Sequence, residues 1–255
     1  MSLTEQIDGK YLYAIINSAT PVCFETKGIG GRDDIVHTIT EGRISAVVSD
    51  SPMVEYANTR RNMMAHTLVL EEVMQRFVML PVRFGTIAPD TQTLSTKVLR
   101  GRYDELTQML EQMRGRVELG LKASWHEGSI FSEIIAENTA IRTLRDKLVG
   151  RSAERTHFDR ARLGELIAKE MERRRTADEQ LIHDRLRGFV CKTKLNKTIG
   201  EQMVINAAYL VEQPAEPELD AAIRAMDADL GKRFLFKYVG PVPPYNFVNI
   251  VVNWS

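Results

Sequence analysis

The sequence predicts an α+β protein of two domains, for three reasons. The chain has 255 residues, which is enough for two ordinary domains. Segments of two-residue periodicity are interspersed with helical ones, and the order from residue 116 onward is β-α(α)-β-β-α-β, the order of a split βαβ, ferredoxin-like domain. We therefore expect an N-terminal α+β domain over 1–114, a modified ferredoxin-like domain with extra helices over 115–239, and a Pro-rich passage with a C-terminal strand over 240–255.

The N-terminal domain begins with elements rich in aromatic and β-branched residues. These are predicted strands over 10–16, 35–39 and 44–48. The last two form a hairpin with a four-residue loop, 40–43, in which Gly42 can take a positive φ. The Gly-rich stretch 23–34 is predicted to be a polar connection.

Two helical regions complete this domain. One begins at Asn58 or Thr59 and carries apolar residues at helical spacing up to Phe77, before Pro81. A second pair of helical stretches covers about 91–114, with a break near Gly101.

The predicted ferredoxin-like domain opens with a strand over 116–125, in which five apolar residues alternate with others. Two helices follow this strand, one over about 129–148 and a long one over about 156–187, which begins with a capping box between Thr156 and Asp159. Three further strands are predicted over 189–195, 203–211 and 233–239. A helix over about 217–230 separates the last two strands. The middle of the long helix, 169–175, has one apolar residue and is expected to be solvated.

The chain ends in an unusual pattern. Residues 240–244 form a stiff Pro-rich passage, and 245–254 alternate as a strand with one wholly apolar face. Such a strand is expected to dock on its own sheet, on the other domain or on a partner.

Charge and cysteine content limit the function classes. Lys+Arg and Asp+Glu both number 34, so the field of the whole chain does not favour nucleic acid. The run Arg173–Arg175 is interleaved with acids, which favours a salt-bridged helix face over a nucleic-acid site. Cys23 and Cys191 are predicted to be buried free thiols of a reducing compartment. With no signal peptide or membrane span in the sequence, we expect a cytoplasmic protein.

No motif of catalysis or cofactor binding is found. Gly28–Gly31 lacks the spacing of a dinucleotide-binding loop and the Lys-Ser/Thr of a P-loop. The five histidines show no metal-ligand spacing, and no nucleophile elbow occurs. We therefore expect no catalytic, cofactor-binding or metal-binding residues and no small-molecule substrate.

Arg83 lies between two apolar residues, so its stem is expected to pack and its head to pair with a carboxylate, with Glu118 as a candidate. Together with Phe84 and Lys122, these residues are predicted to act structurally at the domain interface. The alternative is a small-molecule enzyme with a site at the domain junction near Arg83 and Lys122.

Four motifs in a fixed order carry a family resemblance: LPVRFGT (80–86), GRVELGLK (115–122), INAAYLV (205–211) and GPVPPYNFV (240–248). Over essentially its whole length the chain resembles the gas vesicle protein F/L family. The resemblance implies two α+β domains, the second a modified ferredoxin-like fold, and a non-catalytic accessory role in building gas vesicles. It also implies binding to the hydrophobic shell protein and to other accessory proteins, in some members at the gas-facing inner surface.

The C-terminal strand is the predicted contact with the shell protein, by strand addition or side-chain packing. The candidate residues are Tyr245, Phe247, Val248, Ile250 and Trp254. The alternative is that this segment completes the core between the domains. A nucleic-acid-binding regulator that uses Arg173–Arg175 is a third class, ranked below the assembly role.

Overall fold

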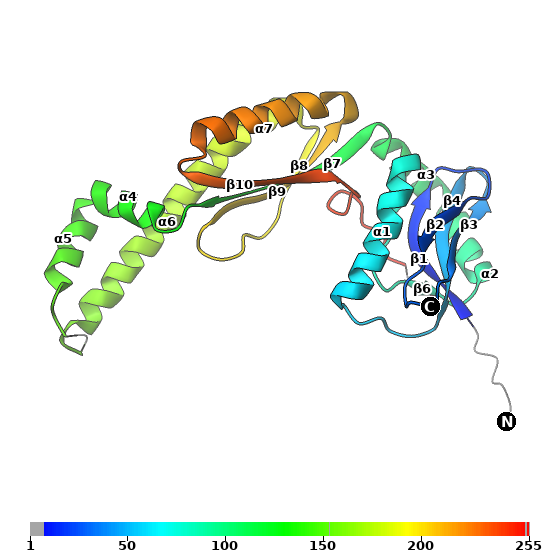
Figure 1. The fold of residues 1–255 in the computed structure, drawn as a ribbon, viewed down its shortest axis with the longest axis horizontal. Helices are drawn as coiled ribbons and strands as arrows, with labels where there is room; N and C mark the ends of the chain where they lie inside the picture. Colours follow the sequence, from blue (N-terminus) through cyan, green and yellow to red (C-terminus); the bar gives the residue numbers. More distant parts are fainter. Residues whose placement is uncertain (1–7, 153, 253, 255) are drawn as a thin grey trace. The chain divides into compact units, whose positions relative to one another are not determined.

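The computed structural model describes residues 8–152, 154–252 and 254. The chain divides into two compact units (Figure 1). Unit 1 comprises the residues up to Glu118 together with those from Pro241 onward, and unit 2 comprises Leu119–Gly240. The C-terminal segment therefore belongs to the same unit as the N-terminal elements.

Unit 1 contains a sheet with the strand order β2-β3-β4-β1-β5, in which the short strand β6 also pairs with β1. The strands are β1 (Asp8–Ile16), β2 (Cys23–Lys27), β3 (Ile35–Glu41), β4 (Ile44–Pro52), β5 (Met79–Pro81) and β6 (Ile87–Ala88). β1 lies antiparallel to β4, with a register shift between Leu12 and Ala14. The three strands predicted at the start of the chain are confirmed.

Two predictions for this sheet are wrong in detail. The stretch predicted to be a connection contains β2, because Phe24 buries its ring and the backbone pairs with β3. The hairpin loop is also shorter than expected: Glu41 pairs with Ile44, so only two residues connect the strands. Gly42 has a φ of 60°, the left-handed conformation that glycine adopts without strain.

Helices cover this sheet (Figure 1). They are α1 (Arg60–Arg76), α2 (Thr91–Leu94), the π-helical segment η1 (Ser95–Arg100) and α3 (Tyr103–Met113). α1 begins where the Thr59 side chain accepts a hydrogen bond from the Asn62 backbone, and Gly101 separates η1 from α3 as predicted. The inner face of α1 buries Val69, Leu70 and Val73 against Tyr11 and Tyr13 of β1.

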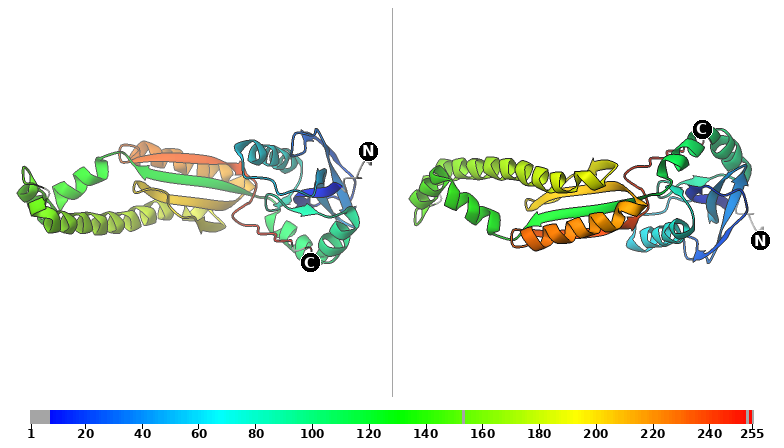
Figure 2. Two further views of the ribbon diagram at one scale, coloured as in Figure 1. Left: turned by 90° about the horizontal axis from the view of Figure 1, so that it is seen from below. Right: turned by 90° about the horizontal axis from the view of Figure 1, so that it is seen from above.

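Unit 2 contains a four-stranded sheet with the order β10-β7-β9-β8. Its strands are β7 (Arg116–Trp125), β8 (Lys192–Leu195), β9 (Met203–Glu212) and β10 (Phe234–Val242); β7 begins and β10 ends in unit 1. The long helix α6 (His157–Leu186) and α7 (Glu216–Leu230) lie on one face of this sheet (Figure 2). α4 (Ser129–Glu137) and α5 (Thr139–Leu148) contact α6.

Three local predictions in unit 2 are wrong. The helix expected over 129–148 is two helices, because the Asn138 side chain accepts a hydrogen bond from Ile141 N–H and starts a new helix. The Thr156 side chain makes no capping bond and donates instead to Ser152 O. The strand expected over 189–195 begins only at Lys192, after the 3-10 turn η3 (Arg187–Phe189). Short 3-10 turns also occur as η2 (Glu154–Thr156) and η4 (Gln213–Ala215).

The middle of α6 is not the solvated turn that the sequence predicted. Arg174 is buried, and its guanidinium lies 3.2 Å from Glu133, 2.6 Å from Glu137 and 3.0 Å from Glu170. Its neighbour Arg173 is exposed and pairs with Glu170 alone. The arginine run therefore joins α6 to α4 through a cluster of ion pairs.

A second polar cluster lies beside the first. Asp178 is buried and accepts hydrogen bonds from the Trp125 indole N–H, at 2.8 Å, and from the Arg233 guanidinium, at 2.9 Å. Burial raises the pKa of the Asp178 carboxyl above its usual value, and the Trp125 hydrogen bond and the charge of Arg233 oppose that shift. The two clusters tie α4 and α6 to β7 and to the start of β10.

The cysteine prediction is half correct. Cys23 and Cys191 are free, but both are exposed. Cys23 lies in the edge strand β2, and Cys191 directly precedes the edge strand β8.

The strand predicted over 245–254 is also wrong. Residues 245–247 form a turn after Pro243 and Pro244, and the only strand-like pairing of the described part of this segment is one parallel bridge from Ile250 to Val82. The turn is closed by Val248 N–H donating to Pro244 O. An extended strand cannot form across such a turn, so the predicted alternation of apolar residues does not produce a ladder.

Candidate functional site

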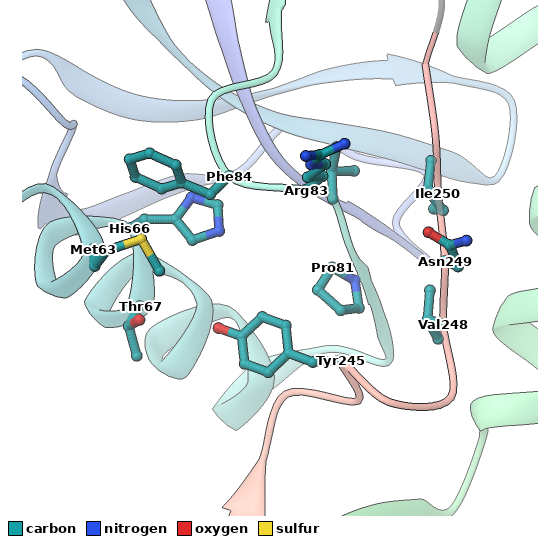
Figure 3. Close-up of a pocket in the computed structure, with 11 residues that line it drawn as sticks. Met63, His66, Thr67, Pro81, Arg83, Phe84, Tyr245, Val248, Asn249 and Ile250 are labelled. Atoms are coloured by element: carbon teal, nitrogen blue, oxygen red, sulfur yellow. The ribbon is translucent and has the colours of Figure 1, made fainter. Parts of the chain in front are cut away.

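Unit 1 contains a pocket of about 420 Å³ (Figure 3). Three segments that are distant in sequence form its walls: α1, the residues that follow β5, and the C-terminal segment. The residues that line it are Met63, His66, Thr67, Pro81, Val82, Arg83, Phe84, Tyr245, Val248, Asn249 and Ile250.

α1 supplies one wall. Met63, His66 and Thr67 are three and four residues apart, so they share one face of the helix. Met63 leaves 41% of its side chain exposed, whereas His66 is buried at 3%. The helix therefore offers an exposed thioether at the rim of the pocket and an imidazole deeper inside it.

His66 is held by an aromatic cluster under the pocket. Its Nδ1 lies 3.0 Å from the Tyr11 hydroxyl, which in turn accepts a hydrogen bond from Gly85 N–H at 2.9 Å. The Tyr11 hydrogen is then available to His66 Nδ1, which favours the tautomer with the proton on Nε2. Tyr13 stacks on the imidazole, and Phe84 meets it edge to face.

Burial determines the protonation of this pair. Desolvation lowers the pKa of His66 to about 4 and raises the pKa of Tyr11 above its usual range. Both side chains are therefore neutral at neutral pH. A neutral imidazole with a pKa this low is a weak base, poorly matched to proton transfer near pH 7.

The C-terminal segment forms the opposite wall and is anchored by a buried carboxylate. Glu118 is 2% exposed, and its two oxygens accept hydrogen bonds from Asn246 N–H at 2.9 Å and from the Asn246 amide at 2.6 Å. Burial raises the pKa of Glu118, and the two bonds from Asn246 oppose that shift. Further along, the Arg102 guanidinium donates to Val251 O and the Lys97 ammonium to Trp254 O.

Arg83 lines the pocket, but it does not form the ion pair with a carboxylate that was predicted from the sequence. Its side chain is exposed, and within the described residues it forms no ion pair. Glu118, its candidate partner, is bonded to Asn246 instead, because the turn after Pro244 brings the Asn246 amide to that carboxylate. The pairing prediction for Arg83 is therefore wrong.

The structure brings together some of the predicted residues and separates others. Arg83 and Phe84 meet Tyr245, Val248 and Ile250 around the pocket (Figure 3). Phe247 and Trp254 are partly exposed in the same C-terminal segment but do not line the pocket. Lys122 lies in unit 2 with an exposed side chain.

Burial also divides the predicted contact residues. Val248 and Ile250 are 6% and 2% exposed, so unit 1 already covers them. Tyr245 leaves 45% of its side chain accessible. Of these three, Tyr245 alone leaves a large side chain accessible to solvent.

Sequence reasoning missed Met63, Thr67 and His66 as members of this site. The apolar residues at helical spacing indicated the helix, but nothing in the sequence showed that the last residues of the chain would pack beside it. Pairing of that kind depends on a single bridge and one buried Glu–Asn contact, which leave no periodic signal.

The arrangement is suited to holding an apolar group. The pocket wall is mostly aromatic and aliphatic, and none of the described residues that line it is a carboxylate. Its polar groups are an imidazole, a guanidinium, two hydroxyls and an amide. Among the residues that the structure describes, no cluster of three His, Cys, Asp or Glu side chains could hold a metal ion. Within the same residues, no helix has the length and apolar character needed to cross a membrane.

Comparisons with known proteins agree with one another. Residues 9–249 match the family model described as gas vesicle synthesis protein GvpL/GvpF. The chain is 30% identical to gas vesicle protein F of Streptomyces sp. (strain CB03234), over 93% of this chain and 98% of that one, and 30% identical to gas vesicle protein F2 of Halobacterium salinarum, over 94% and 92%. Its fold is similar to the crystal structure of GvpF from Anabaena sp. PCC7120, with a TM-score of 0.83, 23% identity and coverage of 96% of this chain and 100% of that one.

Proposed function

Since the chain belongs to the gas vesicle synthesis protein GvpL/GvpF family, we propose that it is a non-catalytic accessory protein that binds the hydrophobic shell protein during vesicle assembly. An accessory role in gas vesicle synthesis follows from the family. Binding of the shell protein and of other accessory proteins, in the cytoplasm and at the gas-facing inner surface of the vesicle, is the proposed part.

The observation that carries the proposal is the pocket of unit 1. A shell subunit that faces a gas space exposes apolar surface, which would aggregate in water if left uncovered. The pocket of about 420 Å³ offers an apolar wall, with Met63 and Tyr245 exposed at its rim. Met side chains adapt to varied apolar partners, and Tyr supplies a rigid aromatic contact at low entropic cost.

The proposal revises which C-terminal residues contact the partner. Tyr245 is expected to touch the shell protein directly, with Phe247 and Trp254 as further candidates. Val248 and Ile250 hold the segment in place, since unit 1 buries both. Side-chain packing in the pocket is favoured over strand addition, because the segment is a turn with one bridge and offers no strand edge.

Catalysis is the weaker alternative. The junction enzyme suggested by Arg83 and Lys122 requires converging acids or bases, and the pocket that contains Arg83 has no carboxylate and a histidine of low pKa. Nucleic-acid binding by Arg173–Arg175 is disfavoured because each arginine pairs with a glutamate.

We also infer that unit 2 is a modified ferredoxin-like fold. Its elements follow the order β-α(αα)-β-β-α-β, and its sheet has the order fourth-first-third-second strand, with two helices on one face. The extra helices α4 and α5 come between the first strand and α6.

The test is co-expression of the shell protein with this chain, followed by pull-down. Met63→Glu places a charge at the apolar rim and should reduce recovery of soluble shell protein at least tenfold, because an unpaired charge would be desolvated on binding. Tyr245→Ala should weaken recovery in the same direction. Met53→Glu is the matched control: Met53 is also a methionine of unit 1, 52% exposed, and it does not line the pocket.

Recovery with Met53→Glu should equal that of the wild type. If Met63→Glu and Tyr245→Ala, both shown to be folded by circular dichroism, recover as much shell protein as the wild type, the pocket is not the contact. If the wild-type chain leaves the shell protein insoluble and unbound even with other accessory proteins supplied, the shell-binding proposal fails.

A further inference from the structure

A second candidate binding surface lies in unit 2, where α5 ends and α6 begins (Figure 1). We call residues 142–162 the arm tip. The arm tip contains seven Lys or Arg and three Asp or Glu, a formal charge of +4. The rest of the chain holds 27 basic and 31 acidic residues, a formal charge of −4. The net charge of the chain is zero, but an excess of basic residues in the arm tip is balanced by an excess of acidic residues in the rest of the chain.

Much of the positive charge of the arm tip is unpaired. Within the described residues the arm tip has two ion pairs, from Arg145 to Asp146 and from Lys147 to Asp159. Arg151, Arg155 and Arg162 are exposed, and none forms an ion pair with any described residue. The dipole of the α5 C-terminus opposes that of the α6 N-terminus, so the positive potential comes from the side chains.

The most exposed large apolar side chains accompany these arginines. Phe158 is 88% exposed and Val149 is 74% exposed, one on each side of the turn. An exposed aromatic residue within a few positions of exposed arginines has the composition of an interaction hot spot, in which Arg and aromatic residues are enriched. A Phe on the first turn of a helix gains nothing for folding when it is left in water.

Hydrogen bonds from Thr156 and Arg160 stabilise the start of α6, which carries Phe158. Thr156 is buried, donates to Ser152 O at 2.8 Å and accepts from the Arg160 guanidinium at 3.0 Å. The same guanidinium donates to Arg151 O at 3.2 Å. Phe158 therefore lies between two residues, Thr156 and Arg160, whose side chains are hydrogen-bonded within the arm tip.

We propose that the arm tip docks onto an acidic surface of a second protein of vesicle assembly, with Phe158 and Val149 entering an apolar pocket and Arg151, Arg155 and Arg162 facing carboxylates. Val149 needs an aliphatic environment that nucleic acid does not provide. Asp146 of α5, Glu154 of η2 and Asp159 of α6 also belong to the arm tip and would repel a continuous line of phosphates. A protein surface can place carboxylates beside the arginines and away from the acidic residues of the arm tip.

The arm tip specifies a surface and an acidic partner for the proposed binding of other accessory proteins, and in that respect it rests on the proposed function; it is separate from shell-protein binding, because it uses unit 2. The probes are the acidic gas vesicle synthesis proteins of the same organism, each purified and titrated calorimetrically against the full-length chain. One of them should bind, and Phe158→Ala should weaken its binding by about 30-fold, the loss typical of a hot-spot side chain. Arg151→Glu with Arg155→Glu should weaken it further and flatten its salt dependence.

Two controls in unit 2 match these variants. Ile199→Ala removes another highly exposed apolar side chain, at 72%, and Lys169→Glu reverses an exposed charge on α6 outside the arm tip. Both should bind the acidic partner as the wild type does. Met63→Glu should also leave this binding unchanged, which separates the arm tip from the pocket of unit 1.

The proposal is overturned if no acidic protein of the set binds the wild-type chain, or if the arm-tip variants bind as tightly as the wild type. It is equally overturned if these variants lose binding only to duplex DNA, to phosphatidylglycerol vesicles or to a second copy of this chain. Because the variants change exposed side chains, their unfolding temperatures should match that of the wild type.

Discussion

At the scale of single residues, His66 gives the sharpest prediction. Its pKa is about 4 in the folded protein and about 6.5 when unfolded, so between these values the unfolded chain binds more protons. The contribution of His66 to stability is therefore complete above about pH 6.5 and is lost as the pH falls toward 4. We expect the wild type to lose about 2 kcal/mol more than His66→Gln between pH 7 and pH 5.

Urea unfolding of both proteins at a series of pH values measures this difference. Carboxylates that titrate in the same range contribute equally to both proteins and cancel in the comparison. Equal pH slopes for the two proteins would contradict the burial of a neutral imidazole under the pocket.

Residue types alone predicted little of this chemistry. The absence of metal-ligand spacing around the histidines was visible in the sequence, but the environment of His66 depends on Tyr11 and Gly85, which are 55 and 19 residues away in the chain. Likewise, the apolar neighbours of Arg83 suggested a packed stem. In the structure Arg83 is exposed, and the carboxylate of Glu118 binds Asn246.

At the scale of elements, the ion-pair cluster of α6 distinguishes two adjacent arginines. Arg174 has an 8% exposed side chain and three glutamates within 3.2 Å, whereas Arg173 is 66% exposed with one. We expect Arg174→Ala to reduce the free energy of unfolding by about 3 kcal/mol, because it removes the buried guanidinium that joins Glu133 and Glu137 of α4 to Glu170 of α6. Arg173→Ala should cost less than about 1 kcal/mol.

Chemical denaturation monitored by the fluorescence of Trp125, which lies in the same unit, measures both losses. Similar losses for the two variants would show that Arg174 does not hold α4 against α6.

Elements with a strong period were predictable, and those defined by tertiary contacts were not. The alternation in β7 and the apolar stripe of α1 come from local burial on one face, so the sequence alone located both. The C-terminal residues alternate just as clearly, yet they form a turn, because Pro243 and Pro244 precede them and Asn246 binds Glu118. A regular period indicates which side chains are buried, but it does not indicate whether the backbone pairs with another strand.

At the scale of the whole molecule, the family was predictable from four motifs in a fixed order, and the comparisons confirm it. The polarisation of charge between the arm tip and the remainder was present in the sequence as well. The structure adds that, among the residues it describes, Arg151, Arg155 and Arg162 form no ion pair, whereas each arginine of the run 173–175 pairs with a glutamate.

We propose that unit 1 covers apolar surface of the shell protein at the pocket beside Tyr245. Photo-crosslinking in cells that assemble vesicles tests this contact, with a photoreactive amino acid placed at position 245 or, for comparison, at the exposed position 199 of unit 2. Crosslinks to the shell protein are expected from position 245 and none from position 199. Crosslinks to the shell protein from position 199 with none from position 245 would contradict the proposal.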